Sequence, residues 1–287
     1  MSNRLHIARA ATRRAFEVRR ELGVDQESPL CPIDAADRRG VEVWFSDADS
    51  LEGLYVRDRL PKILLPAGRP LGRQVFACAH ELGHHELGHG TRLSEYFGPE
   101  FCSENVSDEE YSAHVFAGAF LLPRAAVEAS FRIRGWSIPA ASFEQVYVVA
   151  CSLGVSFEGL LTHISGVLHL LSRTRAQELG KTSLAKFRQQ MTGAKLSQRL
   201  VIVDLQWRDI AVDISVGENV LLPLATTFTN DFLKLIRTSD ASEWVQAVRP
   251  GVSQVSHESG WTAFIRVRRD HFVGLGSVRH LDDPDDQ

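Results

Sequence analysis

The chain has 287 residues, of which 44% are hydrophobic, and its formal net charge is −4. This composition predicts one large or two modest folded domains and excludes wholesale disorder. The slight acidity argues against a dedicated nucleic-acid-binding protein, which would be basic. Because no run of about 18 apolar residues occurs, we expect no membrane-spanning helix.

The first 24 residues contain arginines throughout, have no continuous apolar stretch and include Glu17 and Glu21. These features argue against a secretory or organelle-targeting peptide and predict an amphipathic helix of the folded protein. The four cysteines lack CxxC spacing, which favours free thiols in a reducing cytoplasm. They are Cys31, Cys78, Cys102 and Cys151.

Short strands and longer helices are predicted to alternate in the first half of the chain. Proline and glycine positions bound these elements, and Ser107 is typical of a helix N-cap. After the first helix we expect strands at residues 40–45, 54–56 and 62–65, and helices at 71–87, 108–122 and 124–134.

The second half begins with a predicted helix-turn-helix, formed by helices at 142–153 and 157–171 around a short turn containing Gly154. The stretch from 172 to 199 has seven basic residues and one acid, which indicates a boundary. Beyond it, periodicity predicts strands at 200–205, 210–216, 261–267 and 272–278, and a helix at 224–237. The predicted domains are 1–140, a helix-turn-helix-like segment at 141–172, a basic linker or helix at 173–199, and an α+β domain at 200–287.

Residues 75–90 read VFACAHELGHHELGHG and contain the pattern H-E-x-x-H at His80, Glu81 and His84. Residues four apart lie on one face of a helix, so both imidazoles can bind one zinc ion. The glutamate beside the first histidine lies near the metal, where it can act as a general base. The spacing therefore predicts a zinc hydrolase site on this helix.

The same pattern occurs again at His85, Glu86 and His89. Five residues turn a helix by about 140°, so the two pairs cannot hold the same metal ion. The second pair spans the glycines that end the predicted helix. We therefore assign the metal to the first pair and expect His85 and His89 to be helix-end residues.

A catalytic zinc ion usually takes a third protein ligand. The next predicted helix offers Glu110 or Glu109, and His114 one turn later could be a ligand or donate a hydrogen bond to substrate. However, Ser107 and Glu110 also match a capping box, in which Glu110 would only bond to the helix end. Spacing alone leaves these alternatives open.

The motif helix and the segment EYSAHVFAGAFLLP together resemble the ImmA/IrrE family of zinc metallopeptidases. This segment is similar to the family signature E-x-x-A-x-x-F-A-x-x-L-L-x-P, although His114 stands where the family often has asparagine. The resemblance, which covers about residues 5–170, implies a zincin-like, mostly helical core with a small sheet. It also favours Glu110 over Glu109 as the third ligand, because Glu110 is in register with Ala113 and Phe116.

The resemblance further implies a substrate, because members typically cleave a cognate helix-turn-helix repressor of the XRE type and so induce stress-response or mobile-element genes. The predicted protein is thus a cytoplasmic zinc metalloendopeptidase with one Zn²⁺ per chain, a protein partner and no membrane association. Tyr55, His85 and His114 are candidates for contacts to substrate or to the oxyanion. Residues 200–287 are candidates for a sensory or regulatory domain.

Two other classes of function compete with this prediction. One is a DNA-binding transcription factor that uses residues 146–171, but its recognition segment at 156–171 contains no arginine or lysine. Without such donors the segment is poorly suited to contact phosphates and bases, which argues against direct DNA binding. The other is a metal-bound regulator without peptidase activity, for which Glu81 would be superfluous.

Overall fold

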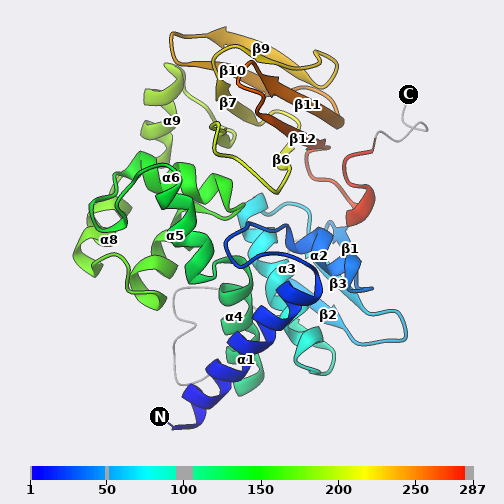
Figure 1. The fold of residues 1–287 in the computed structure, drawn as a ribbon. Helices are drawn as coiled ribbons and strands as arrows, with labels where there is room; N and C mark the ends of the chain where they lie inside the picture. The colour runs from blue at the N-terminus through cyan, green and yellow to red at the C-terminus, as the bar shows by residue number, and fades with distance from the viewer. Residues whose placement is uncertain (1, 49–51, 95–105, 282–287) are drawn as a thin grey trace. The chain divides into compact units, whose positions relative to one another are not determined.

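The computed structural model describes residues 2–48, 52–94 and 106–281, whose contacts divide into two compact units (Figure 1). The first unit comprises the chain up to Ala126 together with His271–Arg279. The second comprises Val127–Asp270 and the residues after Arg279. A short segment near the C-terminus, His271–Arg279, thus belongs by its contacts to the first unit.

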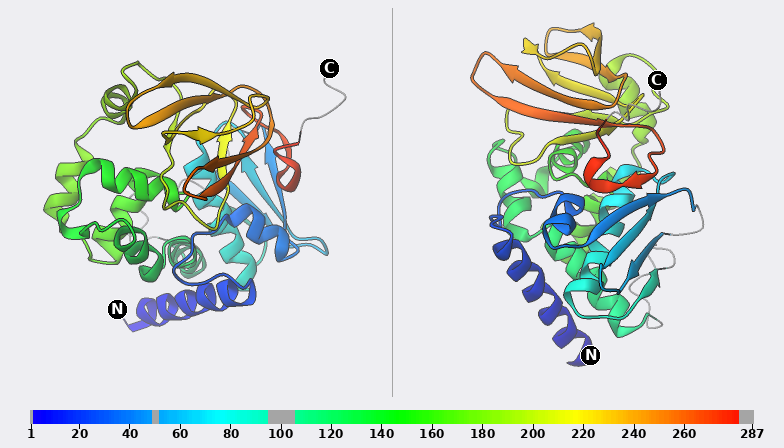
Figure 2. Two further views of the ribbon diagram at one scale, coloured as in Figure 1. Left: turned by 45° about the horizontal axis from the view of Figure 1, so that its top comes forward. Right: turned by 90° about the vertical axis from the view of Figure 1, so that its right-hand side faces the viewer.

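A mixed sheet forms one layer of the first unit, with strand order β13-β1-β3-β2-β4. β1 and β3 run parallel, and the other neighbours are antiparallel. The red C-terminal segment lies beside blue β1 in both figures, where Trp44 pairs with Leu275 (Figures 1 and 2). The strands are β1 (Glu42–Ser46), β2 (Gly53–Val56), β3 (Lys62–Pro66), β4 (Arg92–Ser94) and β13 (Gly274–Leu275), with a 3₁₀ turn, η4, at Gly276–Val278.

Helices α2 (Pro32–Arg38) and α3 (Leu71–Glu86) pack on this sheet, α2 against β1 and α3 against β2 and β3. Side chains along each strand therefore alternate between the two faces of the sheet, and Ile63 and Leu65 of β3 are fully buried. α3 is buried along most of its length, from Leu71 to His84, which makes it the central helix of the unit. The predicted helix at 71–87 is therefore present.

Helix α1 (Ser2–Glu21) packs along α4 (Asp108–Leu121), which in turn packs on α3 (Figure 1). Most of the apolar positions expected on one face of α1 are buried, including Ala11, Ala15 and Val18. Arg19 is also fully buried, a feature that periodicity did not predict. Its guanidinium donates hydrogen bonds to the carbonyl of Phe120 at 2.7 Å and to two carbonyls of the loop after α1.

The second unit opens with helices and includes the predicted helix-turn-helix shape. A turn at Gly154 joins α6 (Phe143–Ser152) to α7 (Phe157–Thr162), which continues into η3 (His163–Val167). The chain bends by 107° between the two helical parts, within the range of such motifs. Among the described helices, none alone is long and apolar enough to cross a bilayer, and this bent pair meets the length and hydropathy criteria only when its two parts are counted together. The helical elements are α5 (Arg124–Arg132), whose first turn still belongs to the first unit, η2 (Ile138–Ala140), α6 (Phe143–Ser152), α7 (Phe157–Thr162), η3 (His163–Val167), α8 (Arg173–Gly180) and α9 (Leu184–Thr192).

Two mixed sheets complete the second unit, with strand orders β5-β7-β10-β9 and β6-β12-β11-β8. The helix predicted at 224–237 is wrong, because β8 and β9 occupy this range and find hydrogen-bonding partners in β11 and β10. The strands are β5 (Leu200–Ile202), β6 (Val212–Ser215), β7 (Asn219–Pro223), β8 (Thr226–Thr227), β9 (Leu233–Thr238), β10 (Ser242–Ala247), β11 (Gly251–His257) and β12 (Thr262–Arg268).

Helices and small mixed sheets together confirm the predicted α+β class. The strand expected at 272–278 is shorter than predicted and pairs with β1 in the first unit, not with β12. Among the cysteines that the structure describes, Cys31, Cys78 and Cys151, none forms a disulfide. Cys102 lies outside the described residues.

Candidate metal centre

Three polar side chains of α3 are completely buried: His80, Glu81 and His84. The four-residue spacing places both imidazoles on one face of the helix, with Nε2 of His80 3.1 Å from Nε2 of His84. Burying so many polar groups on a core helix is costly unless they have partners. The location therefore indicates a functional role for the pair of histidines.

Glu110 of α4 brings a carboxylate to the same two nitrogens. Its Oε2 lies 3.0 Å from His80 Nε2, and its Oε1 lies 3.3 Å from His84 Nε2. The backbone amide of Glu110 also donates to the hydroxyl of Ser107, the N-cap of α4. Ser107 therefore caps α4 through its hydroxyl, while the Glu110 carboxylate, which a capping box would turn back to the Ser107 amide, points to the histidines.

Gly83 explains how α4 comes close enough for this contact. A Cβ at position 83 would lie 3.0 Å from Phe116 Cδ1 and 3.1 Å from the carbonyl oxygen of Ala113. Only a residue without a side chain allows the two helices to approach this closely. Since Ala113 lies one turn after Glu110, the glycine also brings the carboxylate toward the histidines.

The donor set fits a divalent metal ion, since two imidazole nitrogens and one carboxylate oxygen lie within 4.8 Å of one another. Ligand atoms bound tetrahedrally to one zinc ion lie about 3.3 Å apart, close to the three distances measured here. Burial lowers the pKa of His80 to about 4, so its ring is neutral at pH 7, as a ligand must be. Burial alone would raise the pKa of Glu110, but hydrogen bonds with His80 and His84 outweigh it and the pKa is lowered.

Glu81 follows His80 directly, and its carboxylate lies against the backbone of β2. A Cβ added to Gly53 would approach Glu81 Oε1 to 2.5 Å and Cγ to 3.0 Å. The glycine therefore makes room for the carboxylate between the helix and the strand. Sequence analysis did not single out Gly53, because nothing in the local pattern links it to α3.

The residues of the second H-E-x-x-H pattern have other partners. His85 Nδ1 lies 2.9 Å from the hydroxyl of Tyr55, and burial lowers the pKa of this imidazole. Glu86 is 2% exposed and accepts hydrogen bonds from Arg14 of α1 and from Arg39, which follows α2. The third residue of the pattern, His89, contacts His84 Nδ1 through its own Nδ1 at 2.9 Å.

Of the remaining candidates, His114 lies near the centre on α4, with its ring centroid 6.5 Å from that of His80 and 5.1 Å from that of Phe76. Burial lowers its pKa to about 4, so the ring is neutral at pH 7. Tyr55 is 2% exposed, and its hydroxyl is engaged by His85. The structure therefore groups His80, His84 and Glu110, with His114 beside them and Tyr55 paired with His85.

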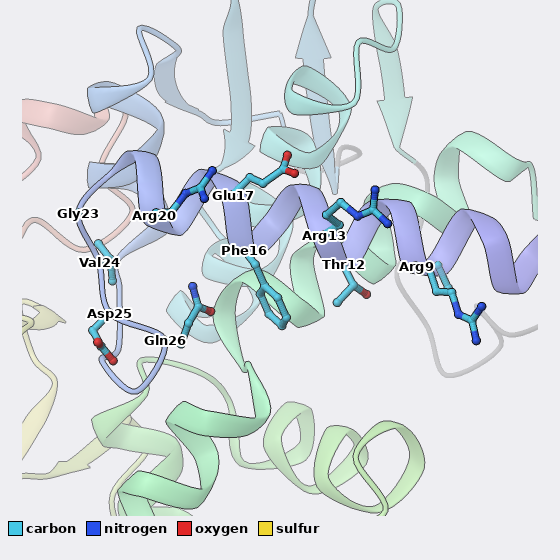
Figure 3. Close-up of a pocket in the computed structure, with 11 residues that line it drawn as sticks. Arg9, Thr12, Arg13, Phe16, Glu17, Arg20, Gly23, Val24, Asp25 and Gln26 are labelled. Atoms are coloured by element: carbon cyan, nitrogen blue, oxygen red, sulfur yellow. The ribbon is translucent and has the colours of Figure 1, made fainter.

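A separate pocket lies beside α1 and the loop that follows it (Figure 3). Its lining includes Arg9, Thr12 and Phe16 of the helix and the loop from Gly23 to Gln26. None of the described residues around the histidine cluster lines this pocket. The pocket therefore adds nothing to the metal centre.

Comparison with known families gives one match. Residues 36–160 match the model of the IrrE N-terminal-like domain, Peptidase_M78, which is a zincin-like peptidase domain. The matched range contains α3, α4 and all three members of the His–His–Glu group. The chain has no match among curated proteins.

Proposed function

Because residues 36–160 belong to the ImmA/IrrE family of metallopeptidases, we propose that the chain is a zinc endopeptidase that cleaves a helix-turn-helix repressor. In this proposal His80, His84 and Glu110 hold one zinc ion and Glu81 is the general base. The observation that carries it is the convergence of three side chains from two helices, whose nitrogen and oxygen atoms lie 3.0–3.3 Å apart.

A zinc ion held by this group supplies a Lewis acid that activates water and stabilises negative charge on the carbonyl oxygen. Zinc is proposed because two imidazoles and a carboxylate form a ligand set common in zinc hydrolases. The buried histidines also exclude bulk water from that side of the centre.

Glu81 then performs the proton transfers. Its carboxylate takes a proton from the attacking water and returns it to the leaving amide nitrogen. Complete burial on α3, next to His80, supports this role, since a carboxylate there is fixed close to the reacting groups. His114, adjacent to the group, is the best-placed further donor to the substrate.

A protein substrate follows from membership in a peptidase family. The family resemblance supports three further parts of the proposal. These are an XRE-type repressor as the substrate, the induction of stress-response or mobile-element genes, and a cytoplasmic location. We assign the helix-turn-helix-like segment a structural or docking role and not DNA reading, because residues 156–171 contain no arginine or lysine.

The test combines metal analysis with a cleavage assay. Purified protein is analysed for zinc and incubated with the repressor-like protein encoded beside it, and the fragments are identified by mass spectrometry. We expect about one zinc per chain and cleavage that stops when a chelator is added. A metal-free protein, or a metal-loaded one that binds the repressor without cutting it, would contradict the proposal.

A further inference from the structure

Helix α3 ends in a backbone arrangement that repeats elsewhere in the chain. The amide of His89 donates to the carbonyl of His84 at 3.0 Å, and the amide of Gly88 donates to that of His85 at 3.1 Å. Gly88 has φ of +76°, the left-handed conformation that this cap requires. These features define a Schellman motif, which brings the second residue after the C-cap back beside the last full turn.

The side chains that this motif brings together are usually apolar. The same pair of backbone bonds ends α1, α2, α5 and α6. Apolar residues fill both corresponding positions in three of these four helices, as Ala36 and Val41, Phe131 and Trp136, and Ala150 and Val155, whereas α1 has Arg19 and Val24 there. At the end of α3 both positions are histidines, and one of them belongs to the candidate metal centre.

The two imidazoles form a hydrogen bond in place of the apolar contact. Nδ1 of His84 lies 2.9 Å from Nδ1 of His89, and the ring centroids are 5.0 Å apart. The other nitrogen of His84, Nε2, faces the centre, 3.3 Å from Glu110 Oε1. The ring of His84 is therefore held at one nitrogen by His89 and offers the other to the metal.

The direction of this bond follows from the chemistry of imidazole. A neutral ring whose Nε2 binds a metal carries its proton on Nδ1. His84 must then donate, so His89 accepts through Nδ1 and carries its own proton on Nε2. Partners of this kind fix the tautomer and the orientation of a metal ligand and make it more basic.

We propose that His89 is a positioning residue that holds His84 in the metal-binding orientation and tautomer through the Schellman motif of α3. This inference rests on the proposed metal site. It also gives the second H-E-x-x-H pattern a role, because the end of the motif helix supports the site without binding metal itself.

The test uses two substitutions in the full chain. His89→Val places at this position the residue that closes the same motif after α2 and α6, and it removes the hydrogen-bond acceptor. His89→Asn keeps an acceptor oxygen. Zinc affinity is measured by competition with a chromophoric chelator, and thermal unfolding of the metal-free proteins reports on the fold.

We expect His89→Val to weaken zinc binding by about 10–100-fold, the usual effect of removing such a partner, with little change in metal-free unfolding. His89→Asn should recover most of the affinity, which a merely structural role would not explain. Equal affinity of the Val variant and the wild type, or an Asn variant as weak as the Val variant, would overturn the inference. A wild type that binds no zinc would overturn the proposed function as well.

A second pair of variants covers the case in which His89→Val does not fold. A Cβ at position 88 would have no atom within 4 Å, so Gly88→Ala causes no steric clash. Its only effect is to disfavour the left-handed backbone conformation of residue 88. The substitution therefore displaces His89 while every histidine side chain is kept. Gly88→Asn is its control, because asparagine tolerates this conformation. We expect zinc affinity to fall in the Ala variant and to stay near wild type in the Asn variant, and equal affinities would overturn the inference.

Discussion

Gly53 of β2 lies directly against Glu81 of α3, so closely that a Cβ on the glycine would stand 2.5 Å from Oε1 of the glutamate. Glu81 is fully buried, so its carboxylate has no free space into which to withdraw. Gly53→Ala should therefore displace the proposed base and lower kcat for repressor cleavage by about 10²-fold or more. Zinc content should not change.

Gly90→Ala is the matched control, since a Cβ there meets no atom within 4 Å. A cleavage time course at equal zinc occupancy compares the two variants. If Gly53→Ala cuts the repressor at the wild-type rate, the close contact does not fix the carboxylate.

Removing one member of the His–His–Glu group should remove the metal. We expect His80→Ala to lose stoichiometric zinc and Glu110→Ala to hold it more weakly, because two ligands leave the site open to exchange. His85→Ala should retain zinc, because the His85 imidazole is hydrogen-bonded to the Tyr55 hydroxyl and is not a member of the His–His–Glu group. Elemental analysis after gel filtration measures all three, and full occupancy of His80→Ala would refute the assignment.

Glu81→Gln keeps the size of the side chain and removes only the basic carboxylate. Zinc content and melting temperature should barely change, while cleavage should slow by about 10²–10⁴-fold. Repressor binding should persist and give a trapped complex, detectable by size-exclusion chromatography. Cleavage close to the wild-type rate would exclude Glu81 as the base.

The close approach of α3 and α4 at Gly83 should be sensitive to a single methyl group. Gly83→Ala would press on Phe116 and on the backbone of Ala113, lowering the free energy of unfolding by about 1–3 kcal/mol. It should also weaken zinc binding by moving Glu110 away from the histidines. Gly180→Ala in α8, where the nearest atom is 3.8 Å away, should not destabilise the protein in the same urea titration.

The C-terminal segment that returns to the first unit should stabilise the edge of its sheet. Arg279 is 2% exposed and donates to the carbonyl of Gly276 at 2.7 Å and to Asp34 at 2.9 Å. We expect Arg279→Ala to speed hydrogen exchange at the amides of β1, with exposed Arg59→Ala as the control. Deletion of residues 200–287 should have a larger effect, because it also removes β13.

Local sequence periodicity determined much of this site in advance. The helix at 71–87 and the placement of His80 and His84 on one face, with Glu81 next to the first histidine, follow from a repeat of 3.6 residues, which needs no knowledge of distant residues. The end of that helix at Gly88 and the capped start of α4 are equally local. The α+β class and the helix-turn-helix-like shape were predicted for the same reason.

Other features depended on which distant segments meet, and only the tertiary structure decided them. Spacing left open whether Glu110 binds a metal or only caps its helix, and the packing of α4 on α3 at Gly83 brings its carboxylate to the two histidines. The range 224–237 has an apolar pattern that also suits a helix, and its strands form only because β10 and β11 offer hydrogen bonds. The contact of Gly53 with Glu81 likewise joins residues 28 positions apart. The hydrophobic pattern of a segment predicts which face of a helix or strand a residue occupies. Which distant residue it contacts on that face depends on how the helices and strands of the whole unit pack.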